Sequence, residues 1–230
     1  MFPFPLYLIT DPLLYSSKEG IEKNKTTFEI SSSAKDHGAQ LDFDAIEQAM
    51  EGGARLVQYR EKKGTRREMY ETAKKLRELT ASRNVTLIIN DEIDLALAVR
   101  ADGVHLGQDD LPIWIARKLL GKESIIGIST HSLGQALRAE SEGADYIGFG
   151  PVFKTSTKES QNPPLGVKAV AETTKQVRIP LYVIGGIQLS DLPELMGAGA
   201  AGVAAISALS GDIRLNVSRW LAFFENHRKT

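Results

Sequence analysis

The stretch Tyr146–Lys158 reads Tyr-Ile-Gly-Phe-Gly-Pro-Val-Phe-Lys-Thr-Ser-Thr-Lys, a short apolar segment followed by a polar loop. The first residues have the character of a buried strand, and Gly150-Pro151 ends it. The loop then places two lysines and three hydroxyl groups within five residues, which suits a phosphate, a diphosphate or a carboxylate. An ordinary solvent-exposed loop is the alternative, and the choice depends on whether the pattern recurs.

The order of strand, polar loop and helix does recur along the chain. The predicted strands, all short and apolar, are Leu6–Thr10, Leu56–Tyr59, Val85–Ile89, Gly103–Leu106, Ile125–Ile128, Tyr146–Phe149, Leu181–Ile184 and Gly202–Ile206. Strands that are apolar on both faces are typical of a buried parallel sheet. Their strict alternation with helices predicts an α/β fold, a single (β/α)8 TIM barrel that spans residues 1–230. An open doubly wound sheet is the alternative, but no Gly-x-Gly-x-x-Gly fingerprint follows the first strand.

The helices between these strands are predicted from apolar spacing and capping residues. They run from Asp42 to Glu51 and from Thr65 to Ser82, and over Glu92–Val99, Leu111–Leu120, Leu133–Glu142, Val167–Thr174, Leu189–Met196 and Asp212–His227. Pro112 is acceptable in the first turn of its helix. Three aromatic residues, Trp114, Tyr146 and Trp220, fall at positions predicted to face the core.

A long polar segment, Leu13–Gln40, follows the first strand. Connections in compact domains usually have only ~4–6 residues, and the low apolar content of this segment argues against a core element. Because it follows a strand end, it would emerge on the face of a barrel where the strands end. We therefore predict an insertion that forms a mobile cover over that face, with a plain disordered insertion as the alternative.

Composition narrows the classes of function. The formal net charge is -1, so no overall charge favours nucleic acid or an anionic membrane. No apolar run approaches the ~20 residues of a membrane span, and the amino terminus lacks the basic region of a signal peptide. The absence of cysteine excludes disulfides, thiolate zinc sites and cysteine nucleophiles. We expect a cytoplasmic protein that binds small phosphorylated molecules, and the sequence leaves open whether it forms a homo-oligomer.

In a (β/α)8 barrel, all strands deliver their carboxyl ends to one face, where catalytic residues gather. The residues predicted on that face are Gln58, Arg60, Lys62, Asn90, Asp91, His105, Gln108, Asp109, Asp110, Ser129, His131, Lys154, Thr155, Thr157, Lys158, Gly185, Gly186 and Ser207. Among them are the cations Arg60, Lys62 and Lys158. Carboxylates such as Asp91 and Asp110 beside these cations would suit a Mg²⁺–diphosphate, because Mg²⁺ binds carboxylate and phosphate oxygens together. Capping of the following helices is the alternative for both aspartates.

A second kind of anion site is expected at the last two strand ends. Gly185-Gly186 allows close backbone approach, and Ile206-Ser207 presents backbone amides and a hydroxyl group. Such loops form the usual phosphate site of a barrel, although a tight turn alone would also explain the glycines. Two anion sites of different kinds suggest two phosphorylated substrates.

The histidines near the strand ends form no recognisable Ser/His/Asp triad. His105 is typical of a hydrogen-bonded core residue. His131 lies on a loop after Ser129-Thr130 and is the better acid/base candidate.

Together, these segments resemble the thiamine-phosphate synthase family, which also includes the thiazole tautomerases. The matching motifs, in family order from Leu41 to Leu209, are Gln58-Tyr59-Arg60-Glu61-Lys62, Asn90-Asp91-x-x-Asp94-Leu95-Ala96-Leu97, Ala101-Asp102-Gly103-Val104-His105-Leu106-Gly107-Gln108-x-Asp110-Leu111, Ile126-Gly127-Ile128-Ser129, Gly150-Pro151-Val152-Phe153-x-Thr155-x-Thr157-Lys158, Ile184-Gly185-Gly186-Ile187 and Gly202-Val203-x-x-Ile206-Ser207. Each motif is weak alone, and the set together is a strong signal. The resemblance implies a barrel that joins 4-amino-2-methyl-5-(diphosphomethyl)pyrimidine to a thiazole phosphate, with Mg²⁺ as the cofactor.

The resemblance also implies roles for individual residues. The pyrimidine diphosphate would be held by Gln58, Tyr59, Arg60, Glu61, Lys62, Asn90, Ser129 and Lys158, of which Ser129 and Lys158 would be catalytic. The thiazole phosphate would be held by Thr155, Ser156, Thr157, Gly186, Ile206 and Ser207, and the metal by Asp91 and Asp110. Motif spacing favours Asp110 over the neighbouring Asp109.

Two features depart from the family pattern: Leu13–Gln40 is longer than usual, and Lys154 stands where proline is common. Two other functions stay open at this point. A thiazole phosphate tautomerase would use His131 as acid/base, but that branch tends to lack the Thr-x-Thr-Lys and metal motifs. A non-catalytic barrel that binds a phosphorylated ligand would not need leaving-group machinery such as Asp91 and Lys158.

Overall fold

The computed structural model describes residues 4–10, 41–155 and 163–227, and over these ranges the chain forms a closed barrel of parallel strands. The strands are β1 (Leu6–Ile9), β2 (Leu56–Tyr59), β3 (Thr86–Asn90), β4 (Gly103–Leu106), β5 (Ile125–Thr130), β6 (Tyr146–Phe149), β7 (Leu181–Ile184) and β8 (Gly202–Ala205). Each strand pairs with its neighbour in sequence, and β1 pairs with β8 to close the ring. The predicted (β/α)8 TIM barrel is confirmed. The predicted insertion Leu13–Gln40 lies outside the described residues.

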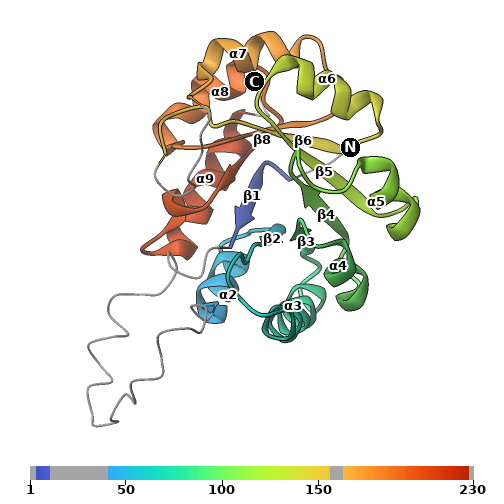
Figure 1. The fold of residues 1–230 in the computed structure, drawn as a ribbon. Helices are drawn as coiled ribbons and strands as arrows, with labels where there is room; N and C mark the ends of the chain where they lie inside the picture. The colour runs from blue at the N-terminus through green and yellow to red at the C-terminus, as the bar shows by residue number, and fades with distance from the viewer. Residues whose placement is uncertain (1–3, 11–40, 156–162, 228–230) are drawn as a thin grey trace.

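The helices surround the strands in chain order, as Figure 1 shows. They are α2 (Phe43–Glu51), α3 (Arg66–Ala81), α4 (Ile93–Val99), α5 (Ile113–Leu120), α6 (Leu133–Ser141), α7 (Gly166–Thr174), α8 (Leu192–Gly197) and α9 (Ile213–His227), and short 3₁₀ turns, η1 (Leu189–Asp191) and η2 (Ser207–Leu209), precede the last two.

Two predicted helices need correction at their starts. The helix expected from Leu111 begins at Ile113, because a residue before proline is disfavoured in the helical region and Pro112 itself is extended. The helix expected over Leu189–Met196 divides into η1 and α8. Pro193 lies in the first turn of α8 and has no N–H with which to continue a preceding helix.

Local capping sets the starts of the first two helices. Asp42 Oδ1 accepts a hydrogen bond from the Ala45 N–H at 3.0 Å. At the start of α3, Thr65 Oγ1 accepts from the Glu68 N–H at 3.3 Å, and Glu68 Oε2 accepts from the Thr65 N–H at 2.8 Å. These bonds satisfy N–H groups that a helix leaves unpaired at its start, which is why the sequence predicted both boundaries.

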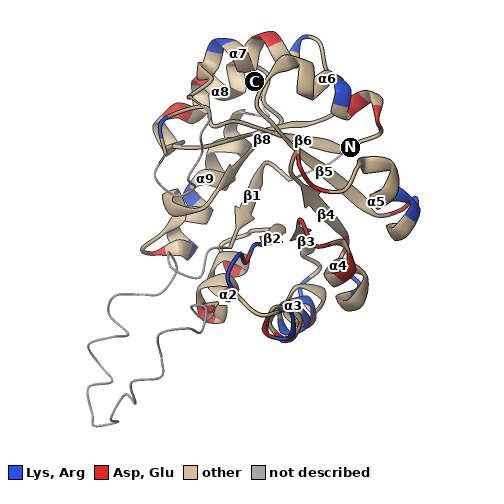
Figure 2. Ribbon diagram, viewed as in Figure 1, with Lys and Arg blue, Asp and Glu red and all other residues tan. Residues whose placement is uncertain are grey.

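Apolar side chains form two layers, one on each face of the strands. The larger layer lies between the sheet and the helices, and the smaller one fills the barrel interior with Tyr7, Ile9, Leu56, Ile88, Tyr146, Tyr182 and Ala204. Because successive strand residues point to opposite faces, one strand can contribute to both layers, as β1 does with Leu8 in the larger layer and Ile9 in the smaller one. Among the residues that the structure describes, Lys, Arg, Asp and Glu lie in helices and loops, and strands β1 to β8 carry none of them (Figure 2). Charge can therefore reach the barrel only at its ends.

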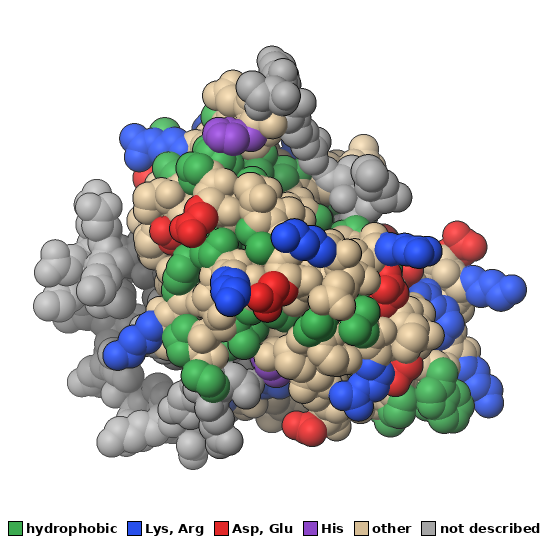
Figure 3. Space-filling view, turned by 90° about the horizontal axis from the view of Figure 1, so that it is seen from above, with side chains coloured by type: hydrophobic (Ala, Val, Ile, Leu, Met, Phe, Trp, Pro, Cys, Tyr) green, Lys and Arg blue, Asp and Glu red, His purple; other side chains and the backbone are tan. Residues whose placement is uncertain are grey.

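The helices present a mixed surface to solvent. Trp220 on α9 is buried as predicted, but Trp114 on α5 is 63% exposed. The stripe of α5 that faces the core is occupied by Ile113 and Ala116, and Trp114 lies off that stripe. On the face drawn in Figure 3, positive, negative and apolar side chains are interspersed. Among the residues that the structure describes, no helix combines the length and apolar character that crossing a membrane requires.

Candidate active site

A pocket opens at the carboxyl ends of the strands, on the face where the sequence predicts the site. Its lining includes residues predicted to hold the pyrimidine diphosphate, namely Gln58, Arg60, Asn90 and Ser129, and residues predicted to hold the thiazole phosphate, namely Thr155, Gly186, Ile206 and Ser207. His105 and His131 also line it. Closure of the barrel therefore brings residues of both predicted binding sites into one pocket, although Tyr59, Glu61 and Lys62 are not in its lining.

The two predicted metal ligands follow β3 and β4, and neither of them caps a helix. The residue before α4 is Glu92 and the residue before α5 is Pro112, and neither side chain makes a capping hydrogen bond. Asp91 has a φ of 62°, a left-handed conformation that non-glycine residues rarely adopt outside functional or turn positions. Its carboxylate forms an ion pair with Lys62.

Asp110 lies against the carboxyl group of Asp91 and accepts a hydrogen bond from the Gly107 N–H at 2.6 Å. Desolvation is the largest cause that raises the pKa of Asp110, and the Asp91 carboxylate raises it further, against the lowering effects of Gly107 and Lys62. Within the described ranges, no group of three or more His, Cys, Asp or Glu side chains is placed to hold a metal ion. A divalent cation held by this pair would therefore take further ligands from a bound molecule or water.

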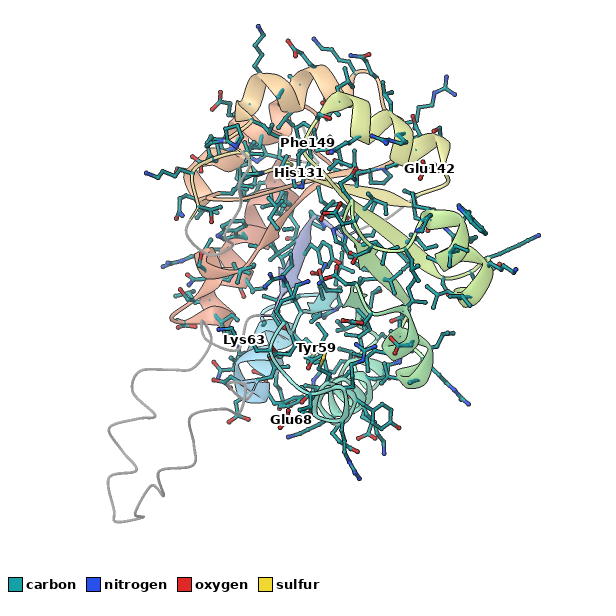
Figure 4. The ribbon with its side chains drawn as sticks, in the orientation of Figure 1. Tyr59, Lys63, Glu68, His131, Glu142 and Phe149 are labelled. Carbon is teal, nitrogen blue, oxygen red and sulfur yellow. The ribbon has the colours of Figure 1, made fainter. Side chains whose placement is uncertain are left out.

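The side chains of the motif Gln58–Lys62, which begins in β2, do not all point the same way: some line the pocket and others lie outside the barrel. Gln58 and Arg60 line the pocket because alternate residues of an extended chain share a face. Tyr59 points the other way, into the layer between the sheet and α3 (Figure 4), where burial raises its pKa to about 12. Glu61 Oε1 accepts hydrogen bonds from the N–H groups of Lys62 and Lys63, both at 2.7 Å, and so shapes the loop.

The turn after β7 requires glycine at two positions, because its backbone is left-handed there and leaves no space for a Cβ. Gly185 and Gly186 have φ values of 100° and 68°, and a Cβ on Gly186 would lie 2.4 Å from the carbonyl oxygen of Lys154. The turn thus packs tightly on the segment that ends at Thr155, which lines the pocket. The other predicted residues of that loop, Ser156, Thr157 and Lys158, lie outside the described residues.

The two histidines differ in their surroundings. His105 is buried and hydrogen-bonded, with Nε2 2.9 Å from Ser129 Oγ and Nδ1 3.0 Å from Tyr146 Oη. The backbone N–H of His131 donates to Gln135 Oε1 at 2.6 Å, and Figure 4 shows the residue close to Phe149, the last residue of β6. Tyr7 also lines the pocket and was not among the residues predicted there. The sequence feature that could have indicated Tyr7 is its phenol group, because the other residues of β1 are all aliphatic.

Several proteins similar in sequence to this chain are named for one activity. A family model described as thiamine monophosphate synthase matches residues 30–209. The chain belongs to the thiamine monophosphate synthase family. The thiamine-phosphate synthase of Dictyoglomus thermophilum is 44% identical over 188 residues, which cover 81% of this chain and 84% of that protein. A thiamine-phosphate synthase of Chloroflexus aurantiacus is 48% identical over 164 residues, 71% of this chain and 76% of that one.

A solved structure named for the same activity agrees in fold. The thiamine phosphate pyrophosphorylase from Pyrococcus furiosus has a TM-score of 0.78 and 34% identity, and the match covers 97% of this chain and 96% of that chain. The match to the thiamine monophosphate synthase family includes every predicted site residue from Gln58 to Ser207.

Proposed function

We propose that this protein is a transferase of thiamine biosynthesis that joins 4-amino-2-methyl-5-(diphosphomethyl)pyrimidine to a thiazole phosphate and releases diphosphate. The observation that carries the proposal is the pocket in which residues of both predicted anion sites meet. An enzyme that couples two substrates must hold their reacting atoms close together, and one pocket lined by residues of both predicted phosphate sites would meet that need.

The early strand ends would stabilise the leaving group. The bond that breaks joins the pyrimidine methylene to a diphosphate oxygen, and the electron-rich aminopyrimidine stabilises the cation that remains. The thiazole nitrogen then attacks that methylene carbon. Arg60, Asn90 and Ser129 line the pocket and offer donors to the diphosphate, which gains charge as the bond breaks. Lys62 and the sequence-predicted Lys158 would add positive charge.

Mg²⁺ is the cofactor of this proposal, and the donors present suit it. Asp91 and Asp110 place two carboxyl groups against each other, and their repulsion contributes to the raised pKa of Asp110. A cation held between them would remove that repulsion and neutralise charge on the diphosphate. Lys62, which forms an ion pair with Asp91, lies beside this pair and would add positive charge toward the diphosphate.

The late strand ends would anchor the second substrate. Thr155, Gly186, Ile206 and Ser207 line this side of the pocket and offer hydroxyl and backbone N–H groups to the thiazole phosphate. Ser156 and Thr157, predicted for the same phosphate, would extend this wall. The coupling step abstracts no proton from carbon, so the mechanism gives His131 no role as a general base.

Incubation of the protein with both substrates and Mg²⁺, followed by mass detection, tests the proposal. We expect thiamine phosphate and diphosphate in equal amounts. Isomerisation of the thiazole substrate alone, without coupling, would indicate a tautomerase, and binding without either product would indicate a non-catalytic barrel. The cytoplasm is the proposed location, in keeping with a chain that has no cysteine.

A further inference from the structure

A continuous run of hydrogen-bonded side chains crosses the barrel interior at the inner wall of the pocket. Gln58 Nε2 donates to Tyr7 Oη at 2.7 Å, and Tyr7 Oη lies 2.8 Å from Tyr146 Oη. Tyr146 Oη lies 3.0 Å from His105 Nδ1, and His105 Nε2 lies 2.9 Å from Ser129 Oγ. We call these five side chains, which come from β2, β1, β6, β4 and β5, the interior chain.

The surrounding strands make room for the interior chain. A Cβ on Gly127 would lie 2.1 Å from the Tyr146 ring, and a Cβ on Gly148 would lie 3.1 Å from the His105 ring. The rings of Tyr7 and Tyr146 also meet edge to face, with centroids 5.8 Å apart. Packing therefore holds both phenols and the imidazole in place.

Both phenols keep their protons. Desolvation is the largest cause that raises the pKa of Tyr7, and burial likewise raises the pKa of Tyr146 well above its ordinary value. Each hydroxyl can therefore donate one hydrogen bond and accept another across the pH range in which enzymes work.

The count of protons gives the interior chain a direction. The Gln58 N–H can only donate, so the Tyr7 oxygen accepts from it, and the Tyr146 hydroxyl at 2.8 Å is placed to accept the Tyr7 O–H in turn. Tyr146 then directs its own O–H to His105 Nδ1. An imidazole that accepts at Nδ1 carries its proton on Nε2 and donates to Ser129 Oγ. Ser129, which lines the pocket, then accepts from His105 and can direct its own O–H to a ligand there.

We propose that the interior chain holds His105 in the Nε2–H tautomer and thereby makes Ser129 a hydrogen-bond donor to the departing diphosphate. Tyr7, Tyr146 and His105 are positioning residues in this arrangement. The identity of the acceptor rests on the proposed function, whereas the tautomer of His105 does not. The opposite tautomer would let His105 accept from Ser129, as in an activated serine nucleophile, and would direct the Ser129 proton away from the pocket.

The tautomer can be measured in the free protein by NMR. With ¹⁵N-labelled histidine, long-range ¹H–¹⁵N spectra distinguish protonated from unprotonated ring nitrogens, and His105→Asn identifies the His105 signals among the 4 histidines. We expect a protonated Nε2 and an unprotonated Nδ1 in the wild type. Tyr146→Phe removes the donor to Nδ1 and should shift His105 toward a mixture of tautomers.

A matched control is Tyr182→Phe. It removes a hydroxyl group from the same interior layer, but that hydroxyl donates to the Phe4 carbonyl oxygen and is not a member of the interior chain. The control should leave the His105 signals as in the wild type. A protonated Nδ1 in the wild type, or an unchanged tautomer in Tyr146→Phe, would overturn the proposal.

A double-mutant cycle measures the consequence for turnover. Tyr146→Phe should lower kcat about tenfold with little change in KM, the scale seen for residues that orient a ligand-binding side chain. When Ser129→Ala is already present, adding Tyr146→Phe should lower kcat by less than about a further twofold, because the effect of Tyr146 on turnover passes through Ser129. Equal losses in both backgrounds would contradict the proposal. Tyr7→Phe, one link farther from Ser129, repeats the cycle should Tyr146→Phe not fold.

The two proposals fail in different ways. A wild-type protein that makes no thiamine phosphate would refute the proposed function, while the NMR measurement would still decide the tautomer. A wild-type protein that makes thiamine phosphate but carries His105 as the Nδ1–H tautomer would refute only the role of the interior chain.

Discussion

The early and the late strand ends of this barrel present different chemistry to the same pocket. After β2, β3 and β4, the face carries side-chain charge: Arg60, Lys62, Asp91 and Asp110. After β7 and β8, it carries glycine backbone and hydroxyl groups. On the charged side Lys62 forms an ion pair with Asp91, whereas the turn at Gly186 packs so closely on the Lys154 carbonyl oxygen that it leaves no space for a Cβ.

This difference fits the unlike needs of the two proposed substrates. The diphosphate gains charge as its bond breaks, so it is best met by charged groups whose interactions strengthen in the transition state. The thiazole phosphate only anchors its substrate, for which fixed amides and hydroxyls suffice. Substitutions on the early side should therefore act mainly on kcat, and substitutions on the late side mainly on KM for the thiazole phosphate.

The largest effect is expected at the carboxylate pair. Asp91→Ala should lower Mg²⁺-dependent kcat by more than about a thousandfold, because the several kcal/mol of charge stabilisation that a metal supplies would be lost. Asp109→Ala is the matched control and should retain activity, since Asp110 is the proposed ligand. Steady-state kinetics across a Mg²⁺ titration provide the measurement. Full turnover of Asp91→Ala in the presence of a chelator would contradict the metal site.

A smaller loss is expected when one cation of the leaving-group site is removed. Lys158→Ala should lower kcat by ~10²–10³, the usual effect of losing one preorganised donor. His131→Ala should lower it much less, because no proton is abstracted when the bond breaks. Parallel kcat and KM measurements on both variants give the comparison. The reverse order of effects would point to tautomerase chemistry instead.

A substitution at the late strand ends should raise KM for the thiazole phosphate. Gly186→Ala places a Cβ 2.4 Å from the Lys154 carbonyl oxygen, so the turn must shift, and KM for the thiazole phosphate should rise about tenfold for each ~1.4 kcal/mol of binding lost. Gly121→Ala is the control for backbone strain alone, because Gly121 has a φ of 89° with no atom within 4 Å of the added Cβ. Equal KM values in the two variants would show that the turn does not bind this substrate.

The smallest effect concerns pH. The pKa of Asp110 is raised, chiefly by desolvation, so Asp110 takes up a proton at a higher pH than an ordinary aspartate. Protons compete with Mg²⁺ for a carboxylate, so KM for Mg²⁺ should begin to rise, on acidification, above the ordinary aspartate pKa of 3.8. Initial rates over a pH series test this. A KM for Mg²⁺ that stays constant down to the ordinary range would contradict it.

The raised pKa of Asp110 also predicts how the stability of the metal-free protein changes with pH. A raised carboxyl pKa means that the fold favours the neutral form, so stability is lost as pH rises through the pKa of Asp110 in the folded state. Asp110→Asn removes this ionisation while keeping an oxygen for the Gly107 N–H, and its Tm above that pH should be slightly higher than that of the wild type. A lower Tm at neutral pH would show that the carboxylate is stabilising.

Much of the fold was predictable because its signals are local. The strand at Tyr146–Phe149 and the helix start at Thr65 each depend on a few adjacent residues, and both appear where the sequence predicts them. The gathering of Gln58, Ser129 and Ser207 at one pocket was also predictable, since parallel strands deliver their carboxyl ends to one face.

Other features depended on what the closed barrel places beside each residue. The sequence by itself determined that Gln58 and Tyr59 point to opposite faces, but only the tertiary structure decided which of them lines the pocket. Likewise, Asp91 and Asp110 follow strands like helix caps, yet they face each other because β3 and β4 are neighbours. Tyr7 and Tyr146 are 139 positions apart, and their hydroxyl groups meet at 2.8 Å. Local patterns determine backbone conformation, whereas partners and burial are set by contacts that form only when distant strands close the barrel.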